Sequence, residues 1–165
     1  KPVRAKESRP LSYERIRCYH AGYAKEDLMY SKLIIPVDLK HVDQMDKALS
    51  VSAEIGKLFG ATLHIVGVTS TAPSETARTP DAFNEKLTAY ANEKSEAFGA
   101  IFEAHTEVSH DPSVDLDDVL QKAAKTIGAD LIVMASHIPG FAEHFVSSNA
   151  GYVASHSPIS VFVVR

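Results

Sequence analysis

Short apolar runs alternate with longer segments of helical periodicity along most of this chain, and this alternation restricts the possible folds more than any other feature. The apolar runs expected to form strands are 33–37, 61–69, 107–110, 131–136 and 159–164. The segments with helical spacing between them are 43–59, 80–102, 116–127 and 149–155. Strand–helix alternation of this kind produces right-handed crossovers between parallel strands. We therefore expect an α/β fold, an open five-stranded parallel sheet with helices on both faces.

Glycine and proline residues mark the expected ends and starts of the helices. Gly60 follows the first helical stripe and Gly128 follows the third, the positions at which a left-handed residue commonly ends a helix. Pro80 follows a polar loop, and proline is favoured in the first turn of a helix. These signals place the boundaries of three of the helices.

Polar and small residues stand at the carboxyl ends of the expected strands, where open parallel sheets bind their ligands. Asp38 ends the first strand, Gly67 lies near the end of the second, and Ala135 to His137 end the fourth. A loop with Pro139 and Gly140 then leads to Ser147-Ser148-Asn149 and a short helix. Hydroxyl groups and free backbone N–H groups at such a helix start are suited to holding an anion.

Several of these segments resemble the universal stress protein family, and most closely its bacterial F/G-type branch. The segments are Lys32–Leu39, Met134–Pro139, Ser148–Ala150 and Ser157–Arg165, within a resemblance that covers about 29–165. The resemblance implies a Rossmann-like fold of the adenine nucleotide alpha hydrolase type. It also implies a role in stress response and a site for an adenine nucleotide.

At the adenosine end of that site, the resemblance implies that Pro36, Val37 and Asp38 line the pocket, together with Gly67 and Met134. The Asp38 carboxylate can accept hydrogen bonds from ribose hydroxyls or an adenine amino group, or it can be an acid at a helix N-terminus. Gly67 either lets the ligand ring approach the second strand or simply kinks the strand end.

At the phosphate end, the residues expected to face the phosphates are Ala135, His137, Ser147, Ser148 and Asn149. Family members that bind ATP carry Gly-x-x-Gly, nine residues, then Gly-Ser or Gly-Thr, whereas this chain has Ala135, Ile138 and Ser147-Ser148. A side chain at Ser147 costs about 1–2 kcal/mol if the site needs a positive φ there. Ser148 and Asn149 can instead be helix caps, and His137 can be an ordinary surface residue.

Two functions of different classes follow from this pattern. The first is a sensor or regulator that binds ATP, ADP or AMP, with Mg²⁺ accompanying ATP. It would be at most a slow ATPase, because no catalytic base or further metal-binding carboxylate is evident beyond Asp38. The second is a nucleotide-free, dimeric interaction protein that acts through a protein partner. Ser147 separates the two, since its side chain decides whether phosphate can approach.

Other kinds of chemistry find no support in the motifs. The sequence has no Walker loop, no Gly-x-Gly-x-x-Gly after a strand, and no Gly-x-Ser-x-Gly elbow. Its eight histidines are scattered without metal-binding spacing, so no metal site is predicted. The net charge of −4 argues against a nucleic-acid surface, and no apolar stretch is long enough to insert into a membrane. Cys18 is the one cysteine, which fits a reducing, cytoplasmic location.

The chain is expected to form one domain, 29–165, preceded by an irregular basic extension, 1–28. The extension has seven Lys and Arg against four acids, a balance of +3, and lacks strand or helix periodicity. It is interpreted as an appendage to the domain: a docking arm, the tail of a longer protein or added material, with an extension that has no function of its own as the favoured interpretation.

The final strand, 159–164, is apolar at nearly every position. An open apolar edge strand invites pairing with other chains, and pairing with the same strand of a second copy satisfies it. The family resemblance implies such a homodimer. The alternative is that helices bury this strand inside a monomer.

Overall fold

The computed structural model describes residues 29–112, 114–135 and 147–165, and gives only the backbone for 147–150. The basic extension 1–28 and the predicted site residue His137 therefore lie outside the described residues. Where the chain is described, no helix has both the length and the apolar character needed to cross a membrane.

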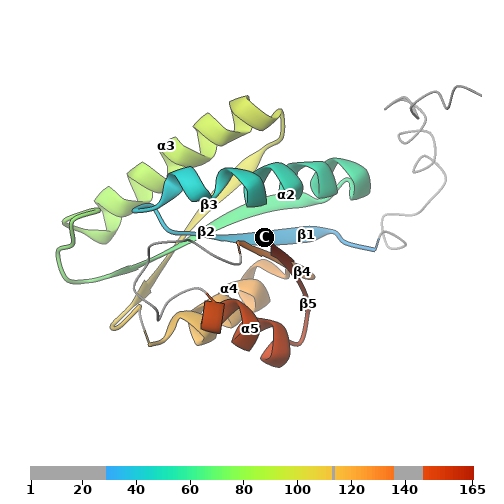
Figure 1. Cartoon of the computed structure of the whole chain (residues 1–165). Helices are drawn as coiled ribbons and strands as arrows, with labels where there is room; N and C mark the ends of the chain where they lie inside the picture. The colour runs from blue at the N-terminus through green and yellow to red at the C-terminus, as the bar shows by residue number, and fades with distance from the viewer. Residues whose placement is uncertain (1–28, 113, 136–146) are drawn as a thin grey trace, which may run out of the picture.

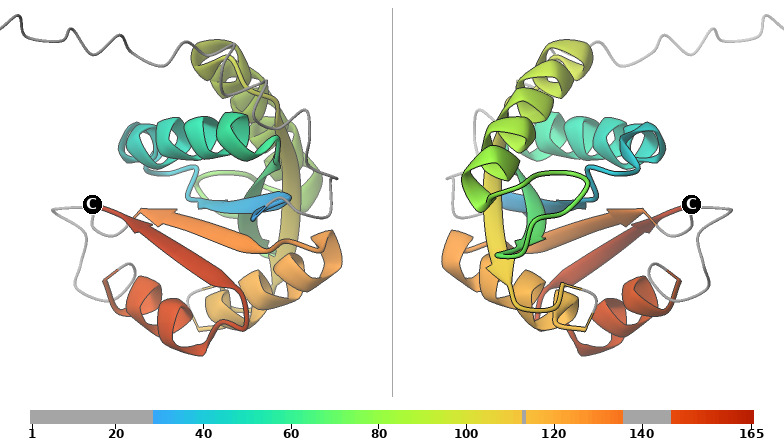
Figure 2. Two further views of the ribbon diagram at one scale, coloured as in Figure 1. Left: turned by 90° about the vertical axis from the view of Figure 1, so that its right-hand side faces the viewer. Right: turned by 90° about the vertical axis from the view of Figure 1, so that its left-hand side faces the viewer.

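Five parallel strands form one sheet in the order β3-β2-β1-β4-β5. The strands are β1 (Lys32–Val37), β2 (Thr62–Ser70), β3 (Phe102–Ser109), β4 (Leu131–Ala135) and β5 (Ser160–Val164). Helices cover both faces of this sheet, as Figures 1 and 2 show. The predicted α/β architecture is therefore confirmed.

The helices divide evenly between the two faces. α2 (Asp46–Phe59) and α3 (Pro80–Phe98) lie on one face, and α4 (Leu116–Ile127) and α5 (Ser147–His156) lie on the other (Figure 1). A short 3-10 turn, η2 (Val42–Gln44), leads from β1 into α2. Each pair of helices packs over its own apolar cluster.

The central strand β1 is apolar on both sides because it separates the two cores. Leu33 and Ile35 belong to the cluster under α2 and α3, whereas Ile34 belongs to the cluster under α4 and α5. All three side chains are fully buried. Continuous apolar character, rather than alternation, is what a parallel strand covered on both faces requires.

The helix starts and stops agree with the sequence signals at most positions. Gly60 and Gly128 follow α2 and α4, as predicted. Pro80 begins α3, and the Thr79 hydroxyl caps this helix by accepting a hydrogen bond of 3.1 Å from the backbone N–H of Ala82. α5 begins at Ser147, two residues earlier than expected.

The expected extent of α3 and β3 was wrong. α3 ends at Phe98 rather than near 102, because Gly99 adopts a left-handed conformation with φ 59° and breaks the helix. The Ser95 hydroxyl, 2.9 Å from the backbone N–H of Phe102, closes the turn that follows. β3 consequently starts at Phe102, five residues before the predicted 107–110 strand.

Candidate functional site

The strand order reverses between β1 and β4. From β1 the chain moves outward through β2 and β3, then crosses back to β4 and β5 on the other side of β1. The loops that leave β1 and β4 therefore run to opposite faces, which opens a crevice at the carboxyl ends of the two strands. A cavity of about 430 Å³ lies there.

The cavity is lined by the ends of three strands and by the loops and helices beside them. Five of the predicted site residues line it: Pro36, Val37, Asp38, Met134 and Ala135. They lie far apart in the sequence and meet because β1 and β4 are neighbours. Their contact with a ligand stays a prediction.

Several lining residues were not predicted from the sequence. Thr69 and Ser70 come from the end of β2, and Asp111 and Pro112 follow β3. The rule used for β1 and β4, that ligands bind at the carboxyl ends of strands, would also have identified these four positions. Side chains from the helices and from the turn before α2 complete the apolar wall, and no sequence signal pointed to them: Met45, Phe83 and Leu116.

Asp38 is held in a local turn directly after β1. One carboxylate oxygen accepts the backbone N–H of Lys40 at 2.9 Å, and the other lies 2.8 Å from Nδ1 of His41. The side chain is still 54% exposed. A carboxylate has about four acceptor positions, so Asp38 can stabilise its own turn and also accept hydrogen bonds from a ligand.

Gly67 has a different place from the one expected. It lies within β2 rather than at the strand end, and it is not among the residues that line the cavity. A Cβ atom at Gly67 would lie 2.8 Å from a ring carbon of Phe83 and 2.9 Å from a methyl carbon of Leu87. The missing side chain is therefore needed for the close packing of α3 on β2, and the expected contact of Gly67 with a ligand ring stays a prediction.

The predicted phosphate-facing residues of the last helix begin α5. Ser147, Ser148 and Asn149 form the start of that helix, so Ser148 and Asn149 lie inside it rather than capping it from outside. α5 connects the carboxyl end of β4 to the amino end of β5. The N-terminus of α5, the positive end of the helix dipole, consequently lies at the carboxyl end of the sheet, where the cavity is.

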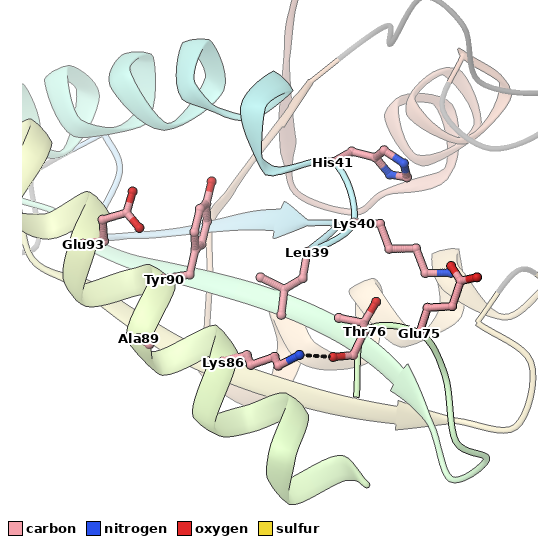
Figure 3. A pocket seen from close by; sticks show the side chains of 9 residues that line it. All are labelled: Leu39, Lys40, His41, Glu75, Thr76, Lys86, Ala89, Tyr90 and Glu93. Atoms are coloured by element: carbon pink, nitrogen blue, oxygen red, sulfur yellow. Dashed lines mark hydrogen bonds between the residues drawn. The ribbon is translucent and has the colours of Figure 1, made fainter. Parts of the chain in front are cut away.

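A wider, more open hollow of about 680 Å³ adjoins the cavity and shares Leu39, Lys40, His41 and Thr76 with it. Figure 3 shows this hollow between the β1–α2 connection, the loop after β2, and α3. The Lys86 ammonium donates to the backbone carbonyl of Thr76 and fastens the loop to α3.

Tyr90 stands on the α3 side of the hollow. Burial, and secondarily the negative charge of Asp46, raises the pKa of the Tyr90 phenol well above its usual range. The phenol is therefore a neutral hydroxyl at physiological pH, and its oxygen lies 3.5 Å from the carbonyl of Val42. Lys94, hydrogen-bonded to Asp46, has a raised pKa and stays charged. The two side chains brace α3 against the start of α2.

The arrangement is suited to binding more than to catalysis. Apolar side chains from both faces form the walls of the cavity, and carboxylate, hydroxyl and backbone groups stand around them. Such a pocket can hold a flat apolar ring and direct attached polar groups toward the rim.

The sequence matches known proteins along most of its length. Residues 29–165 match the model of the universal stress protein family. Universal stress protein G of Shigella flexneri is 30% identical over 151 residues, which cover 83% of this chain and 100% of that protein. Universal stress protein G of Salmonella typhimurium is 27% identical over 142 residues, with the same coverage of both chains.

Solved structures of similar fold include a universal stress protein from Archaeoglobus fulgidus, with a TM-score of 0.63 and 20% identity over 83% of this chain and 100% of that one. A universal stress protein in complex with cAMP has a TM-score of 0.60 and 23% identity, covering 82% of this chain and 97% of that one. An Archaeoglobus fulgidus protein in complex with dAMP has a TM-score of 0.59 and 22% identity, covering 83% and 99%.

Proposed function

Because this chain belongs to the universal stress protein family, we propose that it binds an adenine nucleotide in the cavity at the carboxyl ends of β1 and β4 and acts as a cytoplasmic stress-response sensor or regulator. One observation carries the proposal. The cavity lies at the reversal of strand order and is lined by both Asp38 of the β1 end and Met134 of the β4 end.

The size and walls of the cavity suit an adenine ring. Its volume of about 430 Å³ falls within the range of about 300–1,000 Å³ typical of small-molecule sites. Val68, Met134 and Phe83 supply apolar surface for the faces of a flat ring. The related solved structures in complex with cAMP and dAMP both hold adenine nucleotides, which supports the choice of base.

Asp38 is assigned to the ribose or the adenine amino group. Its two short contacts to Lys40 and His41 fix the direction of the carboxylate. The oxygen positions that remain are acceptors, and both ribose hydroxyls and an exocyclic amino group are donors. This assignment needs no change in the turn that follows β1.

The phosphates are assigned to the start of α5 and to Ala135, and the contact expected of His137, which lies outside the described residues, stays a prediction. Free backbone N–H groups in the first helical turn attract anions. Ser147 occupies the position that is glycine in ATP-binding relatives, so the nucleoside is expected to contribute more of the affinity than the terminal phosphates. ATP with Mg²⁺ is included among the proposed ligands, with turnover that is at most slow; Asp38 and Asp111 are the carboxylates that line the cavity.

Calorimetric titration of the full chain with ATP, ADP and AMP, with and without Mg²⁺, tests the proposal. We expect Asp38→Asn to weaken binding of all three about tenfold, because a hydrogen bond to a charged group contributes about 1.5–3 kcal/mol. Asp43→Asn is the matched control, since Asp43 is exposed on η2 and does not line the cavity. Equal affinity in the two variants would contradict the assignment of Asp38.

The same titration, made with a variant of Ser147, tests the placement of the phosphates. Ser147→Gly is expected to increase the affinity for ATP while leaving that for AMP nearly unchanged, because only the outer phosphates approach this position. If AMP gains as much as ATP, the substitution acts on the nucleoside and our placement of the phosphates is wrong.

A nucleotide-free interaction protein is the second candidate function. It is favoured by the apolar side chains that β5 exposes at the edge of the sheet, Phe162 at 47% and Val163 at 36%. A folded protein that gives no heat with any of the three nucleotides would overturn nucleotide binding and leave this second candidate.

A further inference from the structure

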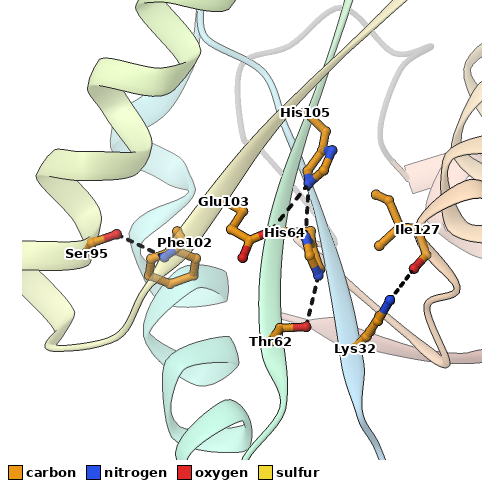
Figure 4. A network of polar contacts seen from close by, with 8 residues as sticks. All are labelled: Lys32, Thr62, His64, Ser95, Phe102, Glu103, His105 and Ile127. Atoms are coloured by element: carbon orange, nitrogen blue, oxygen red, sulfur yellow. Dashed lines mark hydrogen bonds and ion pairs between the residues drawn. The ribbon is translucent and has the colours of Figure 1, made fainter.

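A second polar group lies on the half of the sheet where the strands begin, among residues that do not line the nucleotide cavity. His64 is the third residue of β2, and Glu103 and His105 lie near the start of β3. Strand register pairs His64 with Glu103, and Val66 with His105. Because side chains two residues apart share a face of a strand, all three project from the same face of the sheet. Figure 4 shows them converging.

Three potential ligand atoms meet at one point. Nδ1 of His64 lies 3.0 Å from Nε2 of His105 and 3.3 Å from Oε2 of Glu103, and the last two atoms are 4.0 Å apart. Ligands of a tetrahedral zinc ion, at about 2.0–2.1 Å from the metal, are about 3.3–3.4 Å from one another. The three separations bracket this value, and the largest difference, about 0.6–0.7 Å, is that of the His105–Glu103 pair.

From this geometry we propose that His64, Glu103 and His105 form a Zn²⁺ site with two imidazole nitrogens and one carboxylate oxygen. This ligand set is one that zinc adopts with three protein ligands and an open fourth position for water. None of the three residues lines the nucleotide cavity, although Val66, the strand partner of His105, does.

The surroundings of His64 prepare it for this role. Its Nε2 lies 2.9 Å from the Thr62 hydroxyl, and we assign the proton to Nε2, which leaves the lone pair of Nδ1 directed at the other two ligands. Hydrogen bonding of the outer ring nitrogen is the usual way in which a metal-binding histidine is oriented. The Lys32 ammonium, whose charge acts on His64, donates a hydrogen bond of 2.8 Å to the carbonyl of Ile127.

The burial of the three side chains gives the site both rigidity and access. The His64 side chain is 7% exposed, whereas those of His105 and Glu103 are 35% and 55% exposed. An ion can therefore reach the site from the solvent-exposed side of β3 and bind the buried His64 beneath it. Since β3 is an edge strand held to the sheet by β2, a bound ion would fasten that edge.

Zinc titration of the metal-stripped full chain by calorimetry, together with thermal melting, tests the site. We expect one tight site that Glu103→Gln and His105→Gln each weaken at least tenfold. Zinc should raise the Tm of the parent chain, because an ion that binds only the folded state stabilises it, and should raise it much less in the two variants. Both altered residues reach solvent, so the variants should fold, and their circular dichroism shows whether they do.

Matched controls come from the same strand and its end. Glu107→Gln changes an acid on the same face of β3, and His110→Gln changes an exposed histidine just beyond it. Neither should alter zinc affinity. Co²⁺ in place of Zn²⁺ should give the intense visible absorption of a tetrahedral site, and lose it in His105→Gln. No binding by the folded chain, or binding that survives Glu103→Gln and His105→Gln, would overturn the proposal.

Discussion

At the scale of single residues, Gly67 shows how a position without a side chain can define the packing of a whole layer. Because Phe83 and Leu87 occupy the space where a Cβ atom would stand, α3 lies closer to β2 than any larger residue would allow. Phe83 also lines the nucleotide cavity. The glycine thus acts on the cavity indirectly, through the position of the α3 side chain that forms part of its wall.

Gly67→Ala is expected to lower the free energy of unfolding by about 1–3 kcal/mol, the usual cost of overpacking a core. Gly151→Ala is the matched control, because nothing lies within 4 Å of the Cβ position at this α5 residue. That change should instead stabilise the protein by up to about 1 kcal/mol, since alanine favours helix over glycine. Urea denaturation of both variants checks the pair, and equal effects of the two would show that Gly67 is not closely packed.

The adenosine side of the cavity could be predicted from the sequence to the extent that it depends on strand ends. Asp38 and Ala135 were identifiable because apolar runs stop beside them, whereas Met134 was expected from the family resemblance. Met45 and Phe83 were not, because they enter the cavity from the turn before α2 and from α3, whose packing no local pattern encodes. The pairing of His64 with Glu103 and His105 was hidden for a related reason, since it depends on the register of two strands.

At the scale of elements, the boundary between α3 and β3 shows where sequence periodicity misleads. Phe98 and Phe102 are four residues apart, the spacing of one helix face, yet Gly99 separates them into a helix end and a strand start. β3 has apolar and polar residues in alternation because one face packs on α3 while the other is partly open. That alternation at 102–106 was the available signal, and the helical spacing obscured it.

The two central strands are joined by a carboxylate as well as by their ladder. Asp130, just before β4, accepts hydrogen bonds from the backbone N–H groups of Ser31 at 2.7 Å and Lys32 at 3.1 Å, and from the Ser31 hydroxyl at 2.6 Å. Its own N–H donates to the carbonyl of Lys32 at 3.0 Å. These contacts set the register of β1 against β4, on which the cavity at the opposite end depends.

Removing that carboxylate with Asp130→Ala is expected to lower the free energy of unfolding by about 1–2 kcal/mol, since several charge-assisted hydrogen bonds are lost at a partly exposed site. The control is Glu96→Ala, which changes an exposed acid on α3 and should alter the free energy of unfolding by less than about 0.5 kcal/mol. Denaturant unfolding of the two variants measures the free energies. An Asp130 variant as stable as the Glu96 variant would show that the ladder alone fixes the register.

At the scale of the whole molecule, the sheet has two edges of different character. β3 at one edge mixes polar and apolar residues, whereas β5 at the other is Ser160-Val161-Phe162-Val163-Val164. The order of the strands could not be derived from the sequence, because it depends on which way each crossover turns back. Once the order is known, the apolar β5 stands at an edge rather than in the centre, and two of its side chains are substantially exposed.

That edge leads to a prediction about assembly. We expect β5 to pair with β5 of a second copy about a twofold axis, because such pairing uses free backbone groups and covers the apolar side chains of both chains at once. Phe162→Lys places like charges near each other across the axis, and should convert a dimer of 17.9 kDa chains into a monomer. Light scattering after size-exclusion chromatography gives the mass of each species directly.

The opposite edge supplies the control, because Val108 of β3 is exposed to the same extent as Phe162, 47% in each case. Val108→Lys adds the same charge to an equally exposed apolar position, so a general effect of surface charge on association would appear in both variants. A dimer that survives Val108→Lys and dissociates with Phe162→Lys assigns the interface to β5. The reverse result would assign the interface to β3, beside the His64–Glu103–His105 group. If the parent chain is already a monomer, the prediction of a dimer is wrong, and the apolar edge of β5 is left for a different protein to cover.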